Sequence, residues 1–581
     1  MNLLYSLGRT PWLTALSGFA LATLLALTLA LFGWFFPVLS LLSLIILFGG
    51  FGIALWSLYR SRELFRLATI GGLALVALIT TSQATPSIFA GRDQGSIGIA
   101  AWSLAENHEL AFRSDASEAF FEVYGPGRAL NFPGFSYTDT GALITQFPLG
   151  YISYLALFVS WLGLSGLLIG NALLFVASGW SFLELALLFL PRRSALLATV
   201  LFATSFITLW LVKLTLTENL ALLLYLILAS SLVRIDRDQD ARFLPLAILT
   251  AFLFALTRIE GFVIAGLVLS WMLYRPHVRS FFLSLPKRWL VPSLFFFAFL
   301  FLRDLFMNLP FYTMIAKAGL KYWNELLGSA GGAGTNEPAL GPILFSYGLF
   351  PIFLLGIATL LFGLMKRRYT LLLPLLVAAP TLLYLVNGHI SDDHPWLLRR
   401  YAFTLFPLFL LATACLIENM SHRVKDGQRA WVISTAFAIL FALQCYPALQ
   451  TIQSHEQSGL LEQTAHLSTL ITDRDLLLVD RGSSGDPFAL VAGPLSTIHH
   501  KNAVYFFNPE DYSRIDRSKF DHIYLLAAED ALGRYAEAFG ENLLPVETLS
   551  FSSPRLTAKA AFAPPEIDRV KSDALLFQIT E

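Results

Sequence analysis

The chain has 581 residues, of which 56% are hydrophobic and only 14% are charged. A soluble protein of this size cannot bury so much apolar surface in its own cores, so lipid has to be part of its solvent. The formal net charge is zero, which argues against nucleic acid as a partner. The two cysteines, Cys415 and Cys445, lie in apolar runs, where thiols pack as small hydrophobic groups, so redox chemistry is not indicated.

Apolar runs of about 16 to 24 residues follow one another along the chain. Because backbone polar groups find no water inside a bilayer, each run is expected to form a helix. We expect about thirteen membrane spans, near residues 12–34, 36–58, 67–85, 167–189, 194–211, 218–234, 243–258, 260–275, 288–304, 341–364, 369–387, 401–418 and 429–448.

Arginine and lysine residues cluster in seven short connections, and such residues concentrate on the cytoplasmic side of a membrane. If all seven clusters are cytoplasmic, the other connections lie outside, provided that the apolar stretch 147–162 does not cross the bilayer. We therefore expect that stretch to form an interfacial or re-entrant helix. The clusters are Arg9; Arg60, Arg62 and Arg66; Arg192 and Arg193; Arg234, Arg237 and Arg242; Arg275, Arg279, Lys287 and Arg288; Lys366, Arg367 and Arg368; and Arg423, Lys425 and Arg429.

The composition changes sharply after the last span. Short apolar runs at 476–479, 503–507 and 522–527 alternate with polar and helical stretches, which predicts a small α/β domain outside the membrane. The fold expected is an all-α polytopic membrane protein with a C-terminal α/β extracytoplasmic domain. Its parts are additional N-terminal transmembrane helices (1–66), a transmembrane catalytic domain (67–450) with outer loops 86–146, 305–340 and 388–400, and the α/β domain (451–581).

Ionisable residues gather at the expected outer ends of the spans. Charged groups at membrane depth are costly, so such residues are functional candidates. Carboxylates can deprotonate an attacking hydroxyl, and arginines bind phosphate through paired, charge-assisted hydrogen bonds. Together they suit glycosyl transfer from a lipid phosphate. The candidates are Arg92, Asp93, Lys213, Glu218, Arg258, Glu260, and the group His389, Asp392, Asp393, His394, Arg399 and Arg400 before Tyr401.

The order of these features resembles the GT-C superfamily of membrane glycosyltransferases, over roughly residues 67 to 450. That superfamily includes protein O-mannosyltransferases and lipid A aminoarabinose transferases. Segment 91–107 resembles the juxtamembrane helix that begins near the catalytic acid, and segment 147–163 resembles the family's proline-led juxtamembrane segment. Residues 217–219 resemble the second acidic position, residues 257–261 a turn whose basic residue contacts donor phosphate, and residues 399–401 the basic-aromatic entry to a late span.

The resemblance implies an inverting, polyprenyl-phosphate-sugar-dependent glycosyltransferase that moves a hexosyl or pentosyl group to a hydroxyl of a glycan, lipid or protein. It implies that Asp93 is the base, that Arg258 and Arg400 hold phosphate, and that Glu218 positions the acceptor or a cation. Arg92, Glu260 and Tyr401 complete the expected substrate- and phosphate-binding set. The expected location is the extracytoplasmic face of a bacterial inner (cytoplasmic) membrane, among membrane lipids.

No residue pattern specifies a cofactor, and a divalent cation, Mg²⁺ or Mn²⁺, is left open. Many relatives have two adjacent acids in the first outer loop, whereas Gln94 follows Asp93 here. The polar group before Tyr401, with its two histidines and two aspartates, also offers metal ligands, although its spacing matches no strong motif.

Structural alternatives exist for three of the main candidates. Asp93 could cap the helix that follows it, Glu218 could pair with Lys213, and Arg258 could pair with Glu260. At the level of the whole protein, the alternative to an enzyme is a transporter or flippase of a lipid-linked or polar solute. A catalytically inactive scaffold is a third possibility.

Overall fold

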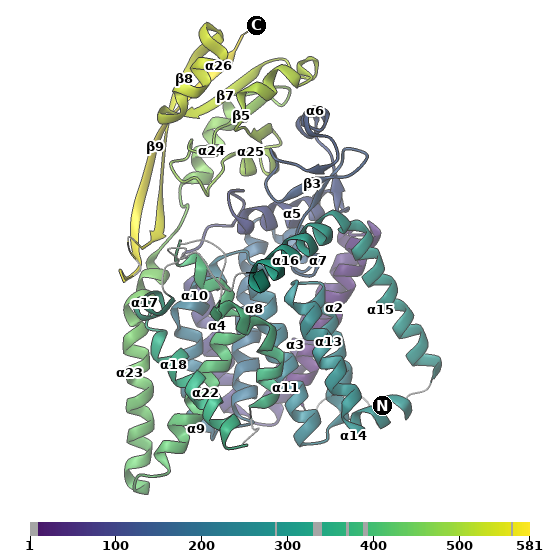
Figure 1. The fold of residues 1–581 in the computed structure, drawn as a ribbon, viewed down its shortest axis with the longest axis vertical. Helices are drawn as coiled ribbons and strands as arrows, with labels where there is room; N and C mark the ends of the chain where they lie inside the picture. The colour runs from purple at the N-terminus through teal and green to yellow at the C-terminus, as the bar shows by residue number, and fades with distance from the viewer. Residues whose placement is uncertain are drawn as a thin grey trace.

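The computed structural model describes residues 10–284, 287–328, 340–367, 371–386, 393–558, 560 and 562–580. A bundle of apolar helices forms one part of the molecule, and a domain built on a β-sheet covers one end of this bundle (Figure 1). We call this end of the bundle the tail end, and the sheet domain the tail.

Six helices in the described part of the chain are each long and apolar enough to cross a membrane. They coincide with six of the spans expected from hydropathy, because an uninterrupted run of apolar residues satisfies its backbone most simply as a helix. These helices are α2 (Pro11–Phe32), α3 (Pro37–Arg60), α4 (Leu64–Thr81), α8 (Ser165–Ala186), α11 (Thr217–Arg237) and α23 (Asp426–Gln453).

Four further spans are possible if bent helix pairs each count as one, which gives up to ten among the described residues. The pairs are α9 (Arg192–Thr204) with α10 (Phe206–Lys213), bent by 49°; α13 (Glu260–Tyr274) with α14 (Pro276–Ser284), 94°; α15 (Lys287–Met307) with α16 (Leu309–Gly328), 78°; and η3 (Trp396–Leu398) and α21 (Arg399–Ala402) with α22 (Leu405–Ser421), 61°.

The remaining expected spans coincide with shorter apolar helices. These are α12 (Leu244–Ala255), α18 (Phe350–Met365), and α19 (Leu372–Ala378) with η2 (Ala379–Leu382) and α20 (Leu383–Val386). At 1.5 Å per residue they are about 18–24 Å long, less than the hydrocarbon thickness of about 30 Å. Helix length and composition therefore support up to ten spans and do not establish the expected thirteen.

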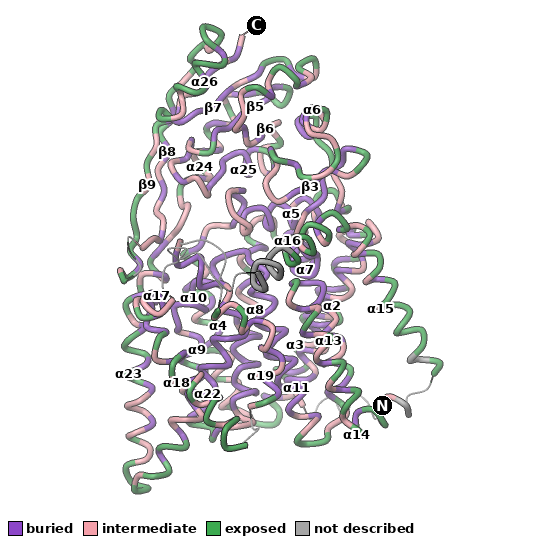
Figure 2. Tube along the Cα trace, viewed as in Figure 1, coloured by how far each residue is buried: buried purple, intermediate pink, exposed green. Residues whose placement is uncertain are grey.

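Helix α11 lies at the centre of the bundle. Almost all of its residues are buried, and α8, α12 and α19 pack around it. In contrast, α3, α4 and α23 expose much of their surface, as can be followed for α23 in Figure 2. An apolar helix enclosed on all sides holds the position of its ends, so a charged group at either end of α11 has a defined place.

Charged side chains join several helices at the end of the bundle away from the tail. Glu184, near the end of α8, lies 2.6 Å from Arg66 at the start of α4 and 3.2 Å from Arg234 near the end of α11. Glu418 of α22 contacts Arg429 of α23. Residues of several of the basic clusters seen in the sequence thus lie together at one end, as expected if they face one side of a membrane.

The contact between Arg66 and Glu184 also fixes the path of the long connection between α4 and α8. Arg66 begins α4 and Glu184 ends α8, so the chain leaves α4 and enters α8 at the tail end. The segment between them, including α7 (Leu149–Leu162), therefore makes no net crossing. Helix α7 has 14 residues and is buried against α2, α5 and α8, in accordance with the expectation that stretch 147–162 is not a span.

The first long connection folds into a compact layer at the tail end. It contains α5 (Asp93–Asn107), α6 (Asp115–Tyr124) and a four-stranded antiparallel sheet in the order β1-β4-β3-β2. The strands are β1 (Ala111–Phe112), β2 (Gly127–Arg128), β3 (Phe135–Tyr137) and β4 (Leu143–Thr145). We call residues 86–146 the outer segment.

The tail is the expected α/β domain. Its five-stranded sheet has the order β6-β5-β7-β9-β8, in which β6, β5 and β7 are parallel and β9 and β8 antiparallel. The strands are β5 (Leu476–Val479), β6 (Asn502–Tyr505), β7 (Ile523–Ala528), β8 (Leu543–Thr557) and β9 (Glu566–Ile579), and the helices are α24 (Leu460–Thr469), α25 (Ala492–Thr497) and α26 (Leu532–Phe539). Strands β5, β6 and β7 coincide with the three short apolar runs and confirm the strands predicted there.

The hairpin β8–β9 was not predicted, and it connects the tail to the bundle. Its strands pair from Leu543 and Ile579 to Thr557 and Glu566, and it extends from the sheet toward the helices (Figure 1). The tail also rests on the outer segment, where Lys519 lies 3.0 Å from Glu118. The tail is thus held against the tail end of the bundle at two places.

Candidate active site

The candidate base, Asp93, is the first residue of α5. Arg92 is the N-cap, and no side chain in the described part of the chain caps the helix. Oδ2 of Asp93 accepts a hydrogen bond of 2.6 Å from Nη1 of Arg399, whose side chain is only 9% exposed, while Asp93 is 41% exposed. Asp93 therefore binds a buried arginine instead of capping its helix, and its partly exposed carboxylate is accessible to a ligand.

Arg399 joins Asp93 to the end of the central helix. Its guanidinium group lies over the ring of Trp396, at 4.3 Å, and its Nε is 4.0 Å from Oε1 of Glu218 at the start of α11. Its Nε is buried and has no hydrogen-bond partner among the described residues. This arginine therefore keeps one buried donor available.

Glu218 and Arg258 form a buried ion pair of 2.7 Å. Arg258 lies in the connection between α12 and α13, its Nη1 donates to the hydroxyl of Thr217 at 3.1 Å, and its guanidinium group lies over Phe403. The alternative pairing of Glu218 with Lys213 is wrong. The Lys213 ammonium group instead donates to the carbonyl oxygens of Thr451 and Ser454.

Glu260 extends the same network to the later helices. It lies 2.9 Å from Arg258 and 3.4 Å from Arg400, and it accepts a hydrogen bond from the hydroxyl of Tyr384. The hydroxyl of Tyr401 donates to the backbone carbonyl of Tyr384 at 2.8 Å, so Tyr401 holds α20 in place. Nε of Arg400 is buried and, like that of Arg399, lacks a partner in the described part of the chain.

Six charged side chains thus form one continuous network at the tail end, with three carboxylates and three guanidinium groups. We call it the central network: Asp93, Arg399, Glu218, Arg258, Glu260 and Arg400. It brings together five of the seven residues that form the expected catalytic and substrate-binding set, while Arg92 and Tyr401 lie outside it. Arg399, which contacts Asp93, was among the ionisable candidates of the sequence, but no role was predicted for it.

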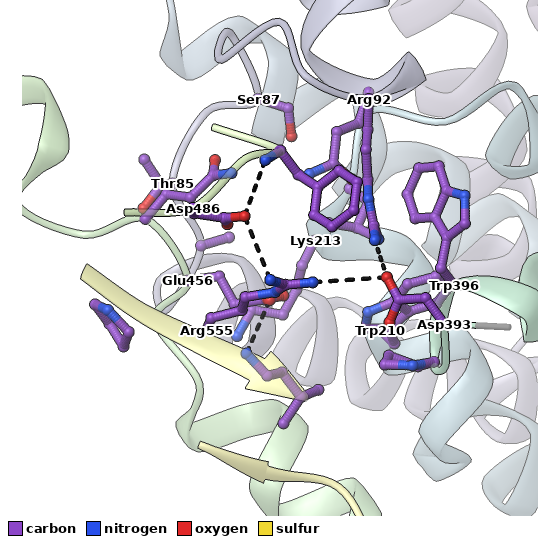
Figure 3. A pocket seen from close by; sticks show the side chains of 18 residues that line it. Thr85, Ser87, Arg92, Trp210, Lys213, Asp393, Trp396, Glu456, Asp486 and Arg555 are labelled. Atoms are coloured by element: carbon purple, nitrogen blue, oxygen red, sulfur yellow. Dashed lines mark hydrogen bonds and ion pairs between the residues drawn. The ribbon is translucent and has the colours of Figure 1, made fainter. Parts of the chain in front are cut away.

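Arg92 points into a second polar cluster (Figure 3). It binds Asp393, and its guanidinium group lies 3.7 Å from the ring centroid of Phe488 and 4.5 Å from that of Trp396. Burial, together with the nearby Arg555, lowers the pKa of Arg92 to about 10. Residue Arg92 therefore connects α5 to the tail rather than to the central network.

The tail supplies the other half of this cluster. Arg555 of β8 lies 3.6 Å from Asp393 and 3.4 Å from Asp486, and the neighbouring backbone N–H of Leu556 donates to Glu456 at 3.0 Å (Figure 3). Burial raises the pKa of Glu456 above its ordinary value. We call this cluster the clasp: Arg92, Asp393, Glu456, Asp486 and Arg555. It fixes the hairpin β8–β9 to the segment that carries Arg399.

The carboxylates of the central network are not arranged to bind a metal ion. Asp93, Glu218 and Glu260 each contact an arginine, so guanidinium groups occupy the positions that a cation would need. Among the described residues, no three His, Cys, Asp or Glu side chains are grouped to hold a metal ion. His389 and Asp392 lie outside the described residues. Asp393 belongs to the clasp, and Nδ1 of His394 is 3.1 Å from the hydroxyl of Tyr347.

No family model matches the chain, and no curated protein matches it. It is similar to the solved structure of the archaeal oligosaccharyltransferase AglB from Archaeoglobus fulgidus in complex with an inhibitory peptide and a dolichol-phosphate. The identity is 11%, the match covers 82% of this chain and 71% of that chain, and the TM-score is 0.47.

Two other solved structures are similar. ArnT from Cupriavidus metallidurans bound to undecaprenyl phosphate has 10% identity over 87% of this chain and 97% of that chain, with a TM-score of 0.48. The arabinofuranosyltransferase AftD from Mycobacteria has 16% identity over 88% of this chain and 40% of that chain, with a TM-score of 0.43. These neighbours are glycosyltransferases of the GT-C kind. At such identities and TM-scores they assign no role to any residue, so the roles proposed below rest on the residues of this chain.

Proposed function

We propose that the protein is an inverting glycosyltransferase that moves a sugar from a polyprenyl-phosphate donor to an acceptor hydroxyl at the tail end of the bundle. The observation that supports this proposal is the pairing of the partly exposed Asp93 with buried Arg399, inside a network that contains two further arginines. It places a carboxylate beside guanidinium groups that suit a phosphate leaving group.

Asp93 acts as the general base in this proposal. The acceptor oxygen forms a bond to the anomeric carbon while the bond from that carbon to the phosphate oxygen breaks. The acceptor proton passes to Asp93, and polyprenyl phosphate leaves with the electron pair. A single displacement with one base forms no covalent intermediate, so the configuration at the anomeric carbon inverts.

The arginines hold the phosphate. The Nε atoms of Arg399 and Arg400 are buried donors without a partner in the described part of the chain, and an unpaired buried donor costs about 1–3 kcal/mol. A phosphate oxygen would satisfy them through charge-assisted hydrogen bonds. We assign phosphate binding to Arg399 and Arg400 directly, and to Arg258 through the charge that it adds between Glu218 and Glu260.

The carboxylates Glu218 and Glu260 position these arginines. Both contact Arg258, and Glu260 also contacts Arg400, so removing Glu218 leaves Arg258 with one of its two carboxylates, and removing Glu260 takes away the carboxylate that Arg400 contacts. We therefore assign Glu218 to orienting the arginines rather than to holding a cation. Tyr401 and Arg92 support the site from outside, through Tyr384 and through the clasp.

The donor's lipid chain lies among the helices and membrane lipids, and the site faces the extracytoplasmic side of an inner membrane. The experiment that tests the function is glycosyl transfer by membranes containing the full chain, supplied with a panel of radiolabelled polyprenyl-phosphate sugars. Release of polyprenyl phosphate with transfer of label from one donor supports the proposal. If no donor is consumed while a lipid-linked solute is moved across the membrane, the protein is a transporter.

A further inference from the structure

A cavity of about 410 Å³ lies beside Asp93, on its exposed side. The outer segment forms one wall, with Arg128, Phe135 and Gly134, and the tail forms the other, with Arg481, Tyr505 and Phe507. Among the described residues, Asp93 is the only acidic one that lines this cavity. The cavity is therefore placed where a second substrate could approach the candidate base.

The two walls are fixed to each other by backbone contacts. The side-chain amide of Asn131 donates to the carbonyl oxygen of Tyr505 at 2.6 Å, and the Tyr505 N–H donates to the Asn131 carbonyl oxygen at 3.2 Å. Gly91 packs directly on the tail, since a Cβ atom there would lie 2.3 Å from the carbonyl carbon of Phe488. The tail thus forms a wall of the cavity that packs closely on the outer segment.

The cavity carries cationic groups that lack acidic partners. Arg128 and Arg481 have no carboxylate within 4.0 Å among the described residues, and Nε of Arg481 donates to the Pro487 carbonyl oxygen. Arg92 and Asp93 also line the cavity, but each is already paired, with Asp393 and with Arg399. The charge that is not balanced by an ion pair, on Arg128 and Arg481, is positive, and a positive cavity favours an anionic ligand.

Aromatic rings line the same cavity. Tyr505 and Phe507 of the tail stack with centroids 5.4 Å apart, both are half-buried, and Phe135 and Phe147 face the cavity from the opposite wall. Aromatic faces provide broad apolar contact for the C–H face of a sugar ring, while a few polar groups fix its orientation. The aromatic rings and the unpaired arginines of the cavity together suit the binding of a charged saccharide.

We propose that this cavity binds the acceptor, and that the acceptor is an acidic saccharide bearing carboxylate or phosphate groups. Arg128 and Arg481 bind its anionic groups, Tyr505 and Phe507 stack on a sugar ring, and one hydroxyl faces Asp93. The role as acceptor rests on the proposed function, whereas the binding of an acidic saccharide does not. The tail thus determines acceptor choice.

The test measures binding to the purified full-length chain in lipid nanodiscs. The probes are tetragalacturonate, its carboxyl-reduced neutral counterpart, and a phosphorylated mannose tetrasaccharide. At least one acidic probe should bind no less than tenfold more tightly than the neutral one, and the acidic probe that binds identifies carboxylate or phosphate as the anion. The double substitution Arg128→Gln and Arg481→Gln should remove this preference, and Tyr505→Ala should weaken all binding at least fivefold.

The matched control is Arg474→Gln, which removes one charge from an exposed position of the tail. It should leave binding unchanged. Equal binding of acidic and neutral probes, or an unchanged preference in the double variant, overturns the proposal. Binding as expected without transfer from any polyprenyl-phosphate donor contradicts the proposed enzyme but not the acidic-saccharide site.

Discussion

Asp93 and Arg399 are 306 positions apart in the chain, yet a hydrogen bond of 2.6 Å joins them. Arg399 lies 4.0 Å from Glu218, which pairs with Arg258 at 2.7 Å. The candidate base and the candidate phosphate-binding groups therefore belong to one network, so a change at one end is felt at the other.

Replacing Arg399 should impair transfer more than binding of the acceptor. Arg399→Gln lacks the buried cationic donor that stabilises the negative charge developing on the leaving phosphate. We therefore expect kcat/KM to fall about 10²-fold or more. Arg399→Lys keeps the charge but loses the planar fork, so it should recover only part of the rate. Radiolabelled transfer assays measure both variants. An Arg399→Gln enzyme with wild-type kcat/KM would contradict the role assigned to this arginine.

Replacing Glu218 should lower stability. Glu218→Gln leaves the buried Arg258 without one of its two carboxylates, and breaking a buried pair typically costs about 3–5 kcal/mol. We expect a clearly lower midpoint of thermal unfolding in detergent. Glu122→Gln, at an exposed position of the outer segment, is the control and should unfold at the wild-type temperature. Equal midpoints for both variants would show that the pair contributes little.

The clasp should hold the hairpin β8–β9 in place. Arg555→Ala removes the contacts with Asp393 and Asp486, so backbone amides of β8 should exchange hydrogen faster than in the wild type. Hydrogen exchange read by mass spectrometry measures this difference. Arg569→Ala, an exposed position on β9, is the control and should not change exchange. Unchanged protection of residues 543–557 in Arg555→Ala would exclude the clasp as the anchor.

Glu456 should make stability depend on pH. Because burial raises its folded pKa above the unfolded value, its contribution to stability is present at low pH and is lost as pH rises through the folded pKa. The difference in unfolding midpoint between wild type and Glu456→Gln should therefore change in favour of the variant as pH increases above the ordinary glutamate pKa. Glu462→Gln, exposed on α24, should show no such trend. A difference independent of pH would contradict the raised pKa.

The sequence predicts the helical bundle and the first three tail strands well, because long apolar runs and short apolar segments have few alternatives. It predicts the hairpin β8–β9 poorly. Much of β8 and β9 is exposed or half-buried and carries charged and polar residues, so the alternation typical of a half-buried strand is weak. The same hairpin brings Arg555 to the clasp, a contact between distant parts of the chain that no local pattern contains.

The candidate site shows the same limit at the level of single residues. Hydropathy places Asp93, Glu218, Arg258 and Glu260 at helix ends of the same side, and the structure joins them in one network. The hydropathy pattern cannot show which of two neighbouring arginines contacts the base, because the side chains of consecutive helix residues point about 100° apart. Arg399 therefore contacts Asp93, while Arg400, preferred from the motif, contacts Glu260.

The central claim is that Asp93 is the base, and the most direct measurement is the rate of glycosyl transfer by purified Asp93→Asn. Asp115→Asn is the matched control, because Asp115 is also the first residue of a helix in the outer segment but lies outside the network. We predict that Asp93→Asn loses transfer by about 10²-fold or more while it keeps its abundance, with an unfolding midpoint lowered less than that of Glu218→Gln because Asp93 is partly exposed, and that Asp115→Asn keeps wild-type activity. Wild-type transfer by a folded Asp93→Asn protein would contradict the assignment.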